Sequence, residues 1–195
     1  MDMEHLELLL PSTSLARRHG LIHRMTSEEK SGVNCFSCSG VCCTFIANSM
    51  MTTPLETAEI LCWLHEQGRL DDELIQQLEN NVRRYRLDQS PPGDGKRAFM
   101  RRTYTCPFFT PGPKGCGLSR SVKPYGCLGF NPNRPDQTEG GDCASDQDLL
   151  AERERQFEAD ETKHNEQLRE RFALDWQKLP MPFALLELIR ALQAD

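Results

Sequence analysis

Cysteines are the residues of this chain best suited to chemistry, and there are nine of them among 195 residues. Eight fall into two groups, which are Cys35-x2-Cys38-x3-Cys42-Cys43 and the set Cys106, Cys116, Cys127 and Cys143. Thiolate sulfur is a ligand of both zinc and iron–sulfur clusters, and four thiolates complete either kind of centre. A two-residue spacing lets both sulfurs reach one ion from a tight turn. The pattern therefore predicts metal binding.

The number of centres is left open by the spacing. Eight thiols fit two four-thiolate centres, or one cluster with spare cysteines. The side chains of the adjacent Cys42 and Cys43 are expected to point apart, so they serve different sites or one of them has another role. The alternative is a set of buried or disulfide-bonded thiols, but burial alone does not produce these spacings. Cys62 stands apart beside Trp63, and we interpret it as a core residue.

Charge is distributed unevenly along the chain. The formal net charge is −6, which argues against a general nucleic-acid-binding protein. The segment Gly95–Pro135 nevertheless contains eight Lys or Arg residues and no Asp or Glu. This segment includes three of the eight clustered cysteines. Its basic residues could offset the charge of thiolate centres, form an ordinary solvated surface, or bind an anionic partner or a phosphate-bearing cofactor.

Helical signals lie on both sides of the second cysteine group. Thr53, Pro54 and Glu56 form the signature of a capping box, and they begin a helical insert that spans residues 53–87 with a second helix from near Asp71. Residues 98–105 suit a short strand. The segment 106–142 is rich in Gly, Pro and Asn, so regular structure should be sparse there.

The last fifty residues predict two further helices. A long charged helix begins near Ser145, and an amphipathic helix covers Phe183–Leu192 after Pro180 and Pro182. The fold class expected is a mainly helical α+β protein, a small metal-stabilised domain with loop-rich cysteine segments and a long C-terminal helix. We expect three segments: an N-terminal arm at 1–34, a cysteine-cluster domain at 35–145 with the helical insert 53–87, and a C-terminal helical extension at 146–195.

Other functional signatures are weak. The sequence contains no Gly-x-Gly-x-x-Gly, no P-loop and no nucleophile elbow. His19 and His23 could share a helix face, but neither lies in a cysteine group, so we interpret both as surface residues. No apolar run approaches the length of a membrane helix, and we expect a cytoplasmic protein that does not bind membranes.

A family resemblance rests on the cysteine motifs. The first cysteine group, together with Cys106-Pro107-Phe108, Gly115-Cys116-x-Leu118 and Lys123-Pro124-x2-Cys127, resembles the YkgJ-type cysteine cluster family, also described as the zinc- or iron-chelating CxxCxxCC domain. The resemblance covers roughly residues 35–145. It implies that the seven cysteines from Cys35 to Cys127 other than Cys62 are metal-site residues, with Cys143 as the eighth. Lys123 departs from the family, which usually has Arg before this proline.

The resemblance leaves several functions open. The first is a metal-binding protein that holds an iron–sulfur cluster or zinc. Flagellin lysine N-methylase carries a similar cysteine cluster, so the second is a cluster-dependent enzyme such as a protein lysine methyltransferase. The third is a zinc-stabilised interaction module that binds a protein partner through the helix at 145–179 or the N-terminal arm.

Overall fold

The computed structural model of the chain describes residues 3–30, 40–89, 102–110, 115–132 and 143–194. Helices dominate these residues, and the described strands form three separate two-stranded antiparallel pairs. The expected mainly helical character is confirmed. The chain divides into two compact units, each assembled from separate stretches of sequence. Unit 1 comprises Met1–Ser12, Ser49–Arg102 and Ala159–Asp195, and unit 2 comprises Thr13–Asn48 and Thr103–Glu158.

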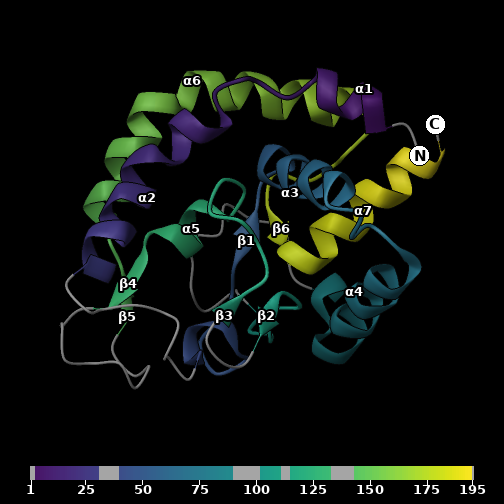
Figure 1. Cartoon of the computed structure of the whole chain (residues 1–195). Coiled ribbons are helices and arrows are strands. Elements are labelled where there is room, and N and C mark those ends of the chain that lie inside the picture. Colours follow the sequence, from purple (N-terminus) through teal and green to yellow (C-terminus); the bar gives the residue numbers. More distant parts are fainter. Residues whose placement is uncertain (1–2, 31–39, 90–101, 111–114, 133–142, 195) are drawn as a thin grey trace. The chain divides into compact units, whose positions relative to one another are not determined.

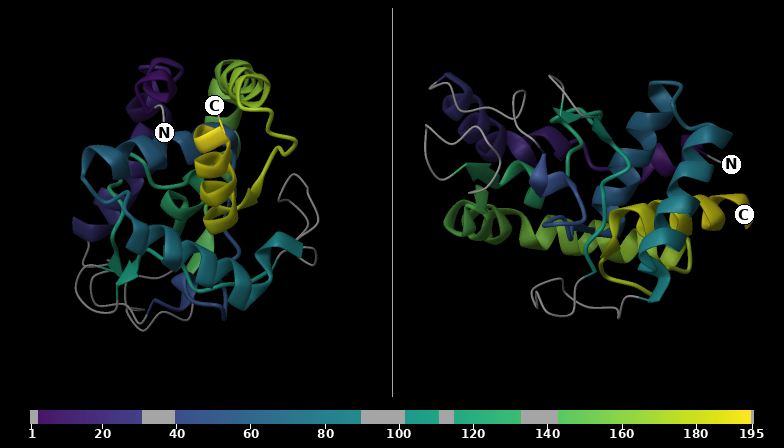
Figure 2. Two further views of the ribbon diagram at one scale, coloured as in Figure 1. Left: turned by 90° about the vertical axis from the view of Figure 1, so that its right-hand side faces the viewer. Right: turned by 90° about the horizontal axis from the view of Figure 1, so that it is seen from below.

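Unit 1 is a small helical bundle. Its complete helices are α1 (Met3–Leu8), α3 (Pro54–Glu66), α4 (Asp72–Tyr85) and α7 (Met181–Ala194), with the one-turn helix η2 at Leu87–Gln89. The short strands β1 (Met51–Thr52) and β6 (Leu179–Pro180) pair antiparallel. The helix α7 packs against both α3 and α4, and this arrangement can be followed in Figures 1 and 2. The core of unit 1 lies between these three helices.

The start of α3 follows from its sequence. The Glu56 N–H donates to Thr53 Oγ1 (3.2 Å) and the Thr53 N–H donates to Glu56 Oε2 (3.1 Å), so the predicted capping box is confirmed. The Leu55 N–H donates to Asn165 Oδ1 (2.9 Å), which satisfies another amide of the first turn. Cys62 is only 4% exposed on this helix, as expected of a core residue.

Apolar side chains explain the packing of α4 and α7. Asp71 caps α4, since its carboxylate accepts from the Leu74 N–H (2.8 Å). Leu78 is fully buried on α4, and Leu188 is fully buried on α7. Each such side chain contributes about 1.5–3 kcal/mol on burial. Packing of this apolar face stabilises the bundle more than helix propensity does.

The helix α6 (Gln147–Arg171) is the long charged helix that the sequence predicted. It contributes residues to both units, and its residues up to Glu158 belong to unit 2. Leu168 is fully buried near its end, whereas most of its acidic side chains are exposed. Within the described parts of the chain, no helix combines the length and apolar character needed to cross a bilayer.

Apart from α2 and its part of α6, the described regular elements of unit 2 are short. It contains α2 (Ser14–Lys30), the one-turn helices η1 (Val41–Cys43) and α5 (Tyr125–Leu128), and the strands β2 (Phe109–Thr110), β3 (Gly115–Cys116), β4 (Phe130–Pro132) and β5 (Cys143–Ser145). The strands pair as β2 with β3 and as β4 with β5. The helix α2 packs on α5, and four buried side chains form their shared core: Leu21, Met25, Tyr125 and Leu128. Figure 1 shows these two helices beside each other.

Two features of the fold go beyond or against the sequence expectations. The segment 1–34, described from the sequence only as an N-terminal arm, contains α1 and α2. Two of the buried positions on α2 are Arg17 and Arg18, so a pattern that counts arginine as polar misses this helix.

The strand expected at 98–105 is wrong for residues 102–105, which form no strand, while residues 98–101 lie outside the described part. The backbone here bonds to a loop instead of a strand. The Tyr104 N–H donates to the Asn48 carbonyl oxygen (2.9 Å), and Asn48 Nδ2 donates to the Tyr104 carbonyl oxygen (3.1 Å). Both backbone groups of Tyr104 are therefore used by one asparagine, and its ring is fully buried. Tyr104, one of the residues that suggested a strand, is thus an aromatic residue buried in the core.

Candidate metal centre

The predicted metal-site cysteines differ in how far the structure describes them. Cys35 and Cys38 lie outside the described residues, and Cys143 is described only through its backbone pairing with Pro132. The other five are half-buried free thiols of unit 2, namely Cys42 and Cys43 in η1, Cys106 before β2, Cys116 in β3 and Cys127 in α5. Cys62 belongs to unit 1 and is not part of this set.

These five thiols interact electrostatically, and we call them the thiol cluster. The charges of Cys106, Cys116 and Cys42 act on Cys127, and those of Cys106 and Cys127 act on Cys43. Interactions between charges reach over roughly 10 Å in a protein, so they place these cysteines in one region of unit 2 but not within bonding distance of one ion. The fold therefore brings together described cysteines from both sequence groups, although the helical insert separates them along the chain.

A backbone hydrogen bond joins the two cysteine groups directly. The Cys106 N–H donates to the Cys43 carbonyl oxygen (2.8 Å). Two further contacts lie on the same pair of segments, because the Phe45 N–H donates to Thr105 Oγ1 (3.3 Å) and Asn48 binds Tyr104 as described above. The segments Cys42–Asn48 and Tyr104–Cys106 are thus held side by side. The backbone position of Cys106 is fixed by the hydrogen bond that its own N–H donates to Cys43.

The β2–β3 pair returns the chain to the cluster. The Phe109 N–H donates to the Cys106 carbonyl oxygen (3.1 Å), and Phe109 is the register partner of Cys116. The Gly117 N–H also donates to the Phe108 carbonyl oxygen (2.7 Å). Because Phe109 links both cysteines, this pairing sets the separation between Cys106 and Cys116.

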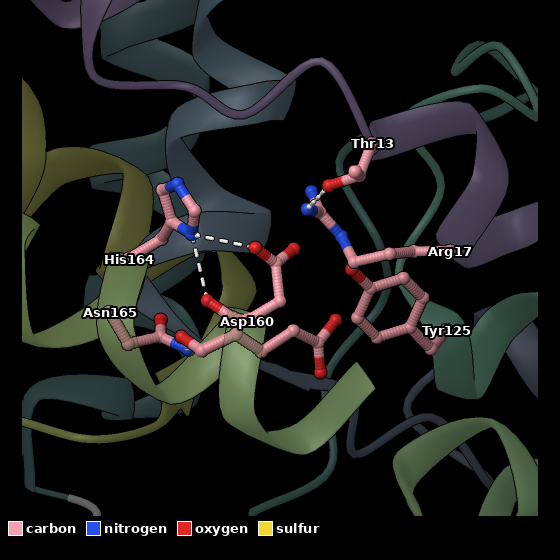
Figure 3. Close-up of polar contacts among 7 residues, drawn as sticks. Thr13, Arg17, Tyr125, Asp160, His164 and Asn165 are labelled. Atoms are coloured by element: carbon pink, nitrogen blue, oxygen red, sulfur yellow. Dashed lines mark hydrogen bonds and ion pairs between the residues drawn. The ribbon is translucent and has the colours of Figure 1, made fainter. Parts of the chain in front are cut away.

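Two buried arginines of α2 hold the segment that contains Cys127. Arg18 Nε donates to the Lys123 carbonyl oxygen (2.9 Å), and Arg17 Nε donates to the Tyr125 hydroxyl (3.0 Å). Arg17 also donates to Thr13 Oγ1 (2.7 Å), a contact that is dashed in Figure 3. Arg17 is 1% exposed and Arg18 is fully buried. Charged side chains are rarely so buried without hydrogen-bond partners.

Tyr125 is enclosed by a third guanidinium group. The Arg153 guanidinium carbon lies 3.3 Å from the centroid of the Tyr125 ring, and Arg153 Nε donates to the Arg17 carbonyl oxygen (3.1 Å). Stacking on the ring face is a cation–π contact, which strengthens as water is excluded. We refer to Arg17, Arg18 and Arg153 as the arginine clamp. The sequence analysis missed it, although the spacing of Arg17, Leu21 and Met25 by four residues was a usable signal.

Protonation of the cluster depends on burial and on neighbouring thiols. The Cys42 and Cys43 sulfurs are 4.0 Å apart, so the expectation that these side chains point apart is wrong. A hydrogen bond from Cys43 lowers the pKa of Cys42 to about 7. The same hydrogen bond, together with burial, raises the pKa of Cys43. Burial raises the pKa of Cys106 to about 12, and burial with the charges of Cys106 and Cys116 raises that of Cys127 well above its usual value. Near neutral pH, Cys42 is therefore the most acidic of these thiols.

Among the described basic residues, Lys123 is one whose charge acts on the thiol cluster. Its charge lowers the pKa values of Cys42, Cys106 and Cys127, opposing the effect of burial. Arg120, by contrast, pairs with Glu29, and Arg102 is exposed. Of the three interpretations of the basic segment, the structure supports counter-charge at Lys123 and an ordinary surface at Arg102.

The described residues supply suitable donors but not a complete ligand set. All six cysteines whose side chains are described are free thiols. Within the described ranges, no three His, Cys, Asp or Glu side chains form a group that could hold a metal ion. The argument for a metal therefore depends on the donor chemistry of the cluster. Thiols lose their protons when a metal cation binds to their sulfurs.

Comparisons of the chain with models of protein families, with curated proteins and with solved structures find no match. The resemblance to the YkgJ-type family consequently stays a prediction. Any functional argument must rest on the thiol cluster and on the elements that position it.

The acidity of Cys42 predicts selective alkylation in metal-free, reduced protein. Only the thiolate reacts, so the rate at Cys42 should rise to half its maximum near the pKa of about 7, while Cys106 reacts only far above neutral pH. Mass spectrometry after iodoacetamide treatment at a series of pH values measures both. Cys43→Ala removes the hydrogen-bond donor and should raise this midpoint, whereas Cys43→Ser keeps a donor. Identical midpoints in all three proteins would contradict the assignment.

Gly40 provides a test of how tightly the first cysteine group is held. Its φ is +71°, and an added Cβ would overlap the Phe109 ring. Gly68 has a similar φ of +62° but open space around it. Gly40→Ala should lose about 1–2 kcal/mol for its backbone conformation plus about 1–3 kcal/mol for the overlap, and Gly68→Ala only the first part. Urea unfolding measures both, and equal losses would show that Phe109 does not contact this turn.

Substitution of Arg18 tests the arginine clamp. Arg18→Met removes the bonds to the Lys123 carbonyl and to Ser14, which should cost about 2–3 kcal/mol and release α5. Hydrogen exchange at the amides of Cys127 and Leu128 should accelerate. Arg24→Met is the matched control on α2, because Arg24 is half-exposed and its ion pair with Glu28 contributes about 0–1 kcal/mol. Similar exchange rates in the two variants would show that the clamp does not hold α5.

Proposed function

We propose that this chain is a metal-binding protein whose clustered cysteines hold an iron–sulfur cluster or zinc. The observation that carries the proposal is the thiol cluster, in which the charges of Cys106 and Cys127, from beyond the helical insert, act on Cys43, and that of Cys42 acts on Cys127. The two sequence groups are also joined by the hydrogen bond between the backbones of Cys106 and Cys43, which burial of separate thiols would not require. The six cysteines whose side chains are described are free thiols, which suits a reducing compartment, and we propose the cytoplasm.

The proposed ligands are the eight cysteines of the two sequence groups: Cys35, Cys38, Cys42, Cys43, Cys106, Cys116, Cys127 and Cys143. Cys62 is excluded because it is buried in α3 of unit 1, whereas the thiol cluster belongs to unit 2. Lys123 would offset part of the negative charge of the thiolates. Four thiolates around Zn²⁺ or around a four-iron cluster in its 2+ state leave a net charge of −2, so a nearby cation is favourable.

A metal would add to the stability of unit 2. Its cysteines lie in one-turn helices, short strands and loops, which have few backbone hydrogen bonds of regular structure, although Tyr104, Phe108 and Leu128 in these segments are buried. Metal binding to a structural thiolate site contributes about 10–16 kcal/mol at neutral pH, comparable with the whole stability of a typical domain. We therefore expect removal of the metal to lower the stability of the segments around Cys106, Cys116 and Cys127, which remain folded but open more often, while the stability of α3, α4 and α7 is unchanged.

Anaerobic purification followed by elemental analysis tests the proposal. An iron–sulfur centre gives a brown protein that absorbs visible light, whereas stoichiometric zinc gives a colourless one. Cys116→Ser should lose at least part of the metal and lower the melting temperature. Cys62→Ser is the matched control and should keep the metal, even though replacing a buried thiol lowers stability.

Chelation provides a second measurement that does not depend on a variant. Removing metal from the wild-type chain should accelerate hydrogen exchange in unit 2 and leave the helices of unit 1 protected. Neither iron nor zinc in air-free material would overturn the proposal, and so would equal metal content in Cys116→Ser and wild type with unchanged melting.

A further inference from the structure

The outer face of α2 carries two histidines one turn apart. His19 and His23 are both exposed, their ring centroids are 6.4 Å apart, and their planes differ by 23°. They lie in the middle of a regular helix that spans Ser14–Lys30. The structure thus confirms that both are surface residues, as expected from the sequence. It adds that they face each other across one turn.

The other side of α2 is fully engaged. Successive residues of an α-helix are rotated by about 100°, so Arg17, Leu21 and Met25 form one stripe. These three side chains are buried in unit 2. His19 and His23 fall on the opposite side, roughly half a turn away. An ion could reach the two imidazoles without any opening of the fold.

We propose that His19 and His23 form a second metal site, which binds a divalent first-row transition ion and is independent of the thiol cluster. Imidazole nitrogen suits Zn²⁺, Cu²⁺ and Ni²⁺. Two histidines four residues apart on one helix face are a recurring way to present two nitrogens to a single ion. Arg24, which follows His23, forms an ion pair with Glu28 (2.9 Å), which reduces its repulsion of a cation, and Arg18, which precedes His19, is fully buried.

The geometry needs only a change of side-chain rotamer. A zinc–nitrogen distance of about 2.0–2.1 Å places both nitrogens closer together than the present ring centroids. Exposed side chains change rotamer within nanoseconds, so this adjustment is small compared with a backbone movement. Two protein ligands leave the remaining positions to water. The ion should therefore exchange readily, unlike one held by four thiolates.

The two proposed sites differ in ligand chemistry. Thiolates favour soft or borderline ions and clusters. The affinity of a pair of imidazoles with water follows the order Ni²⁺ < Cu²⁺ > Zn²⁺, so Cu²⁺ is bound most tightly. The histidine site needs none of the eight proposed cysteine ligands. A test of the histidine site therefore does not depend on whether the proposed function is correct.

Calorimetric titration of the full chain with Ni²⁺, as purified with its thiols in their native state, tests the site. The wild type should show a binding event that weakens by about tenfold or more in His19→Gln and equally in His23→Gln. His65→Gln is the matched control, since His65 is an exposed histidine of α3 without a histidine one turn away, and it should leave the event unchanged. Any Ni²⁺ bound by thiols is common to all four proteins and cancels in the comparison.

A spacing variant separates geometry from composition. The double substitution His23→Gln with Arg24→His keeps two histidines on α2 but moves the second away from the shared face, so it should bind as weakly as His23→Gln alone. Hydrogen exchange of α2 amides should also slow when Ni²⁺ bridges the two turns in the wild type. Equal Ni²⁺ affinity in wild type, both single variants and the spacing variant would overturn the proposal, as would the lack of any Ni²⁺ binding by the wild type.

Discussion

The organisation of unit 2 depends on one backbone hydrogen bond, from the Cys106 amide to the Cys43 carbonyl oxygen. It joins chain segments separated by the whole helical insert. Closing a loop of this length has an entropic cost, which grows only slowly with the number of residues enclosed. The insert can consequently form its own bundle in unit 1 while its two ends bring the cysteines together. Asn48 and Tyr104 reinforce the same junction.

Gathering thiols in this way creates an electrostatic conflict. Several buried thiolates repel one another and lose hydration, so most of these groups hold their protons more firmly than an exposed cysteine would. Lys123 relieves this effect only in part. The thiols avoid this conflict by keeping their protons; a bound cation or cluster would also resolve it, because its charge would compensate the thiolates and its bonds would replace the lost hydration. This is the physical basis of the metal centre that we propose.

The arginine clamp shows how a helix outside the cysteine groups positions one of them. Arg17 and Arg18 are buried because the Tyr125 hydroxyl and the Lys123 carbonyl accept their hydrogen bonds. Removal of water makes these bonds stronger and also makes their loss more damaging. The segment that contains Cys127 is therefore held by α2 rather than by regular structure of its own. The N-terminal residues belong to the architecture of the candidate site.

Local sequence determined the helices α3, α4, α6 and α7, because caps, proline positions and apolar spacing act within one or two turns of the chain. It also identified the cysteine pattern, since the residue type and the spacing of cysteines are properties of the sequence alone. It could not place α2, whose buried face includes two arginines, nor foresee that Tyr104 would bond to Asn48 instead of a strand. Those outcomes were decided by tertiary structure: an arginine can be buried only where distant acceptors meet it, and thiols so far apart in sequence become neighbours only when the chain folds.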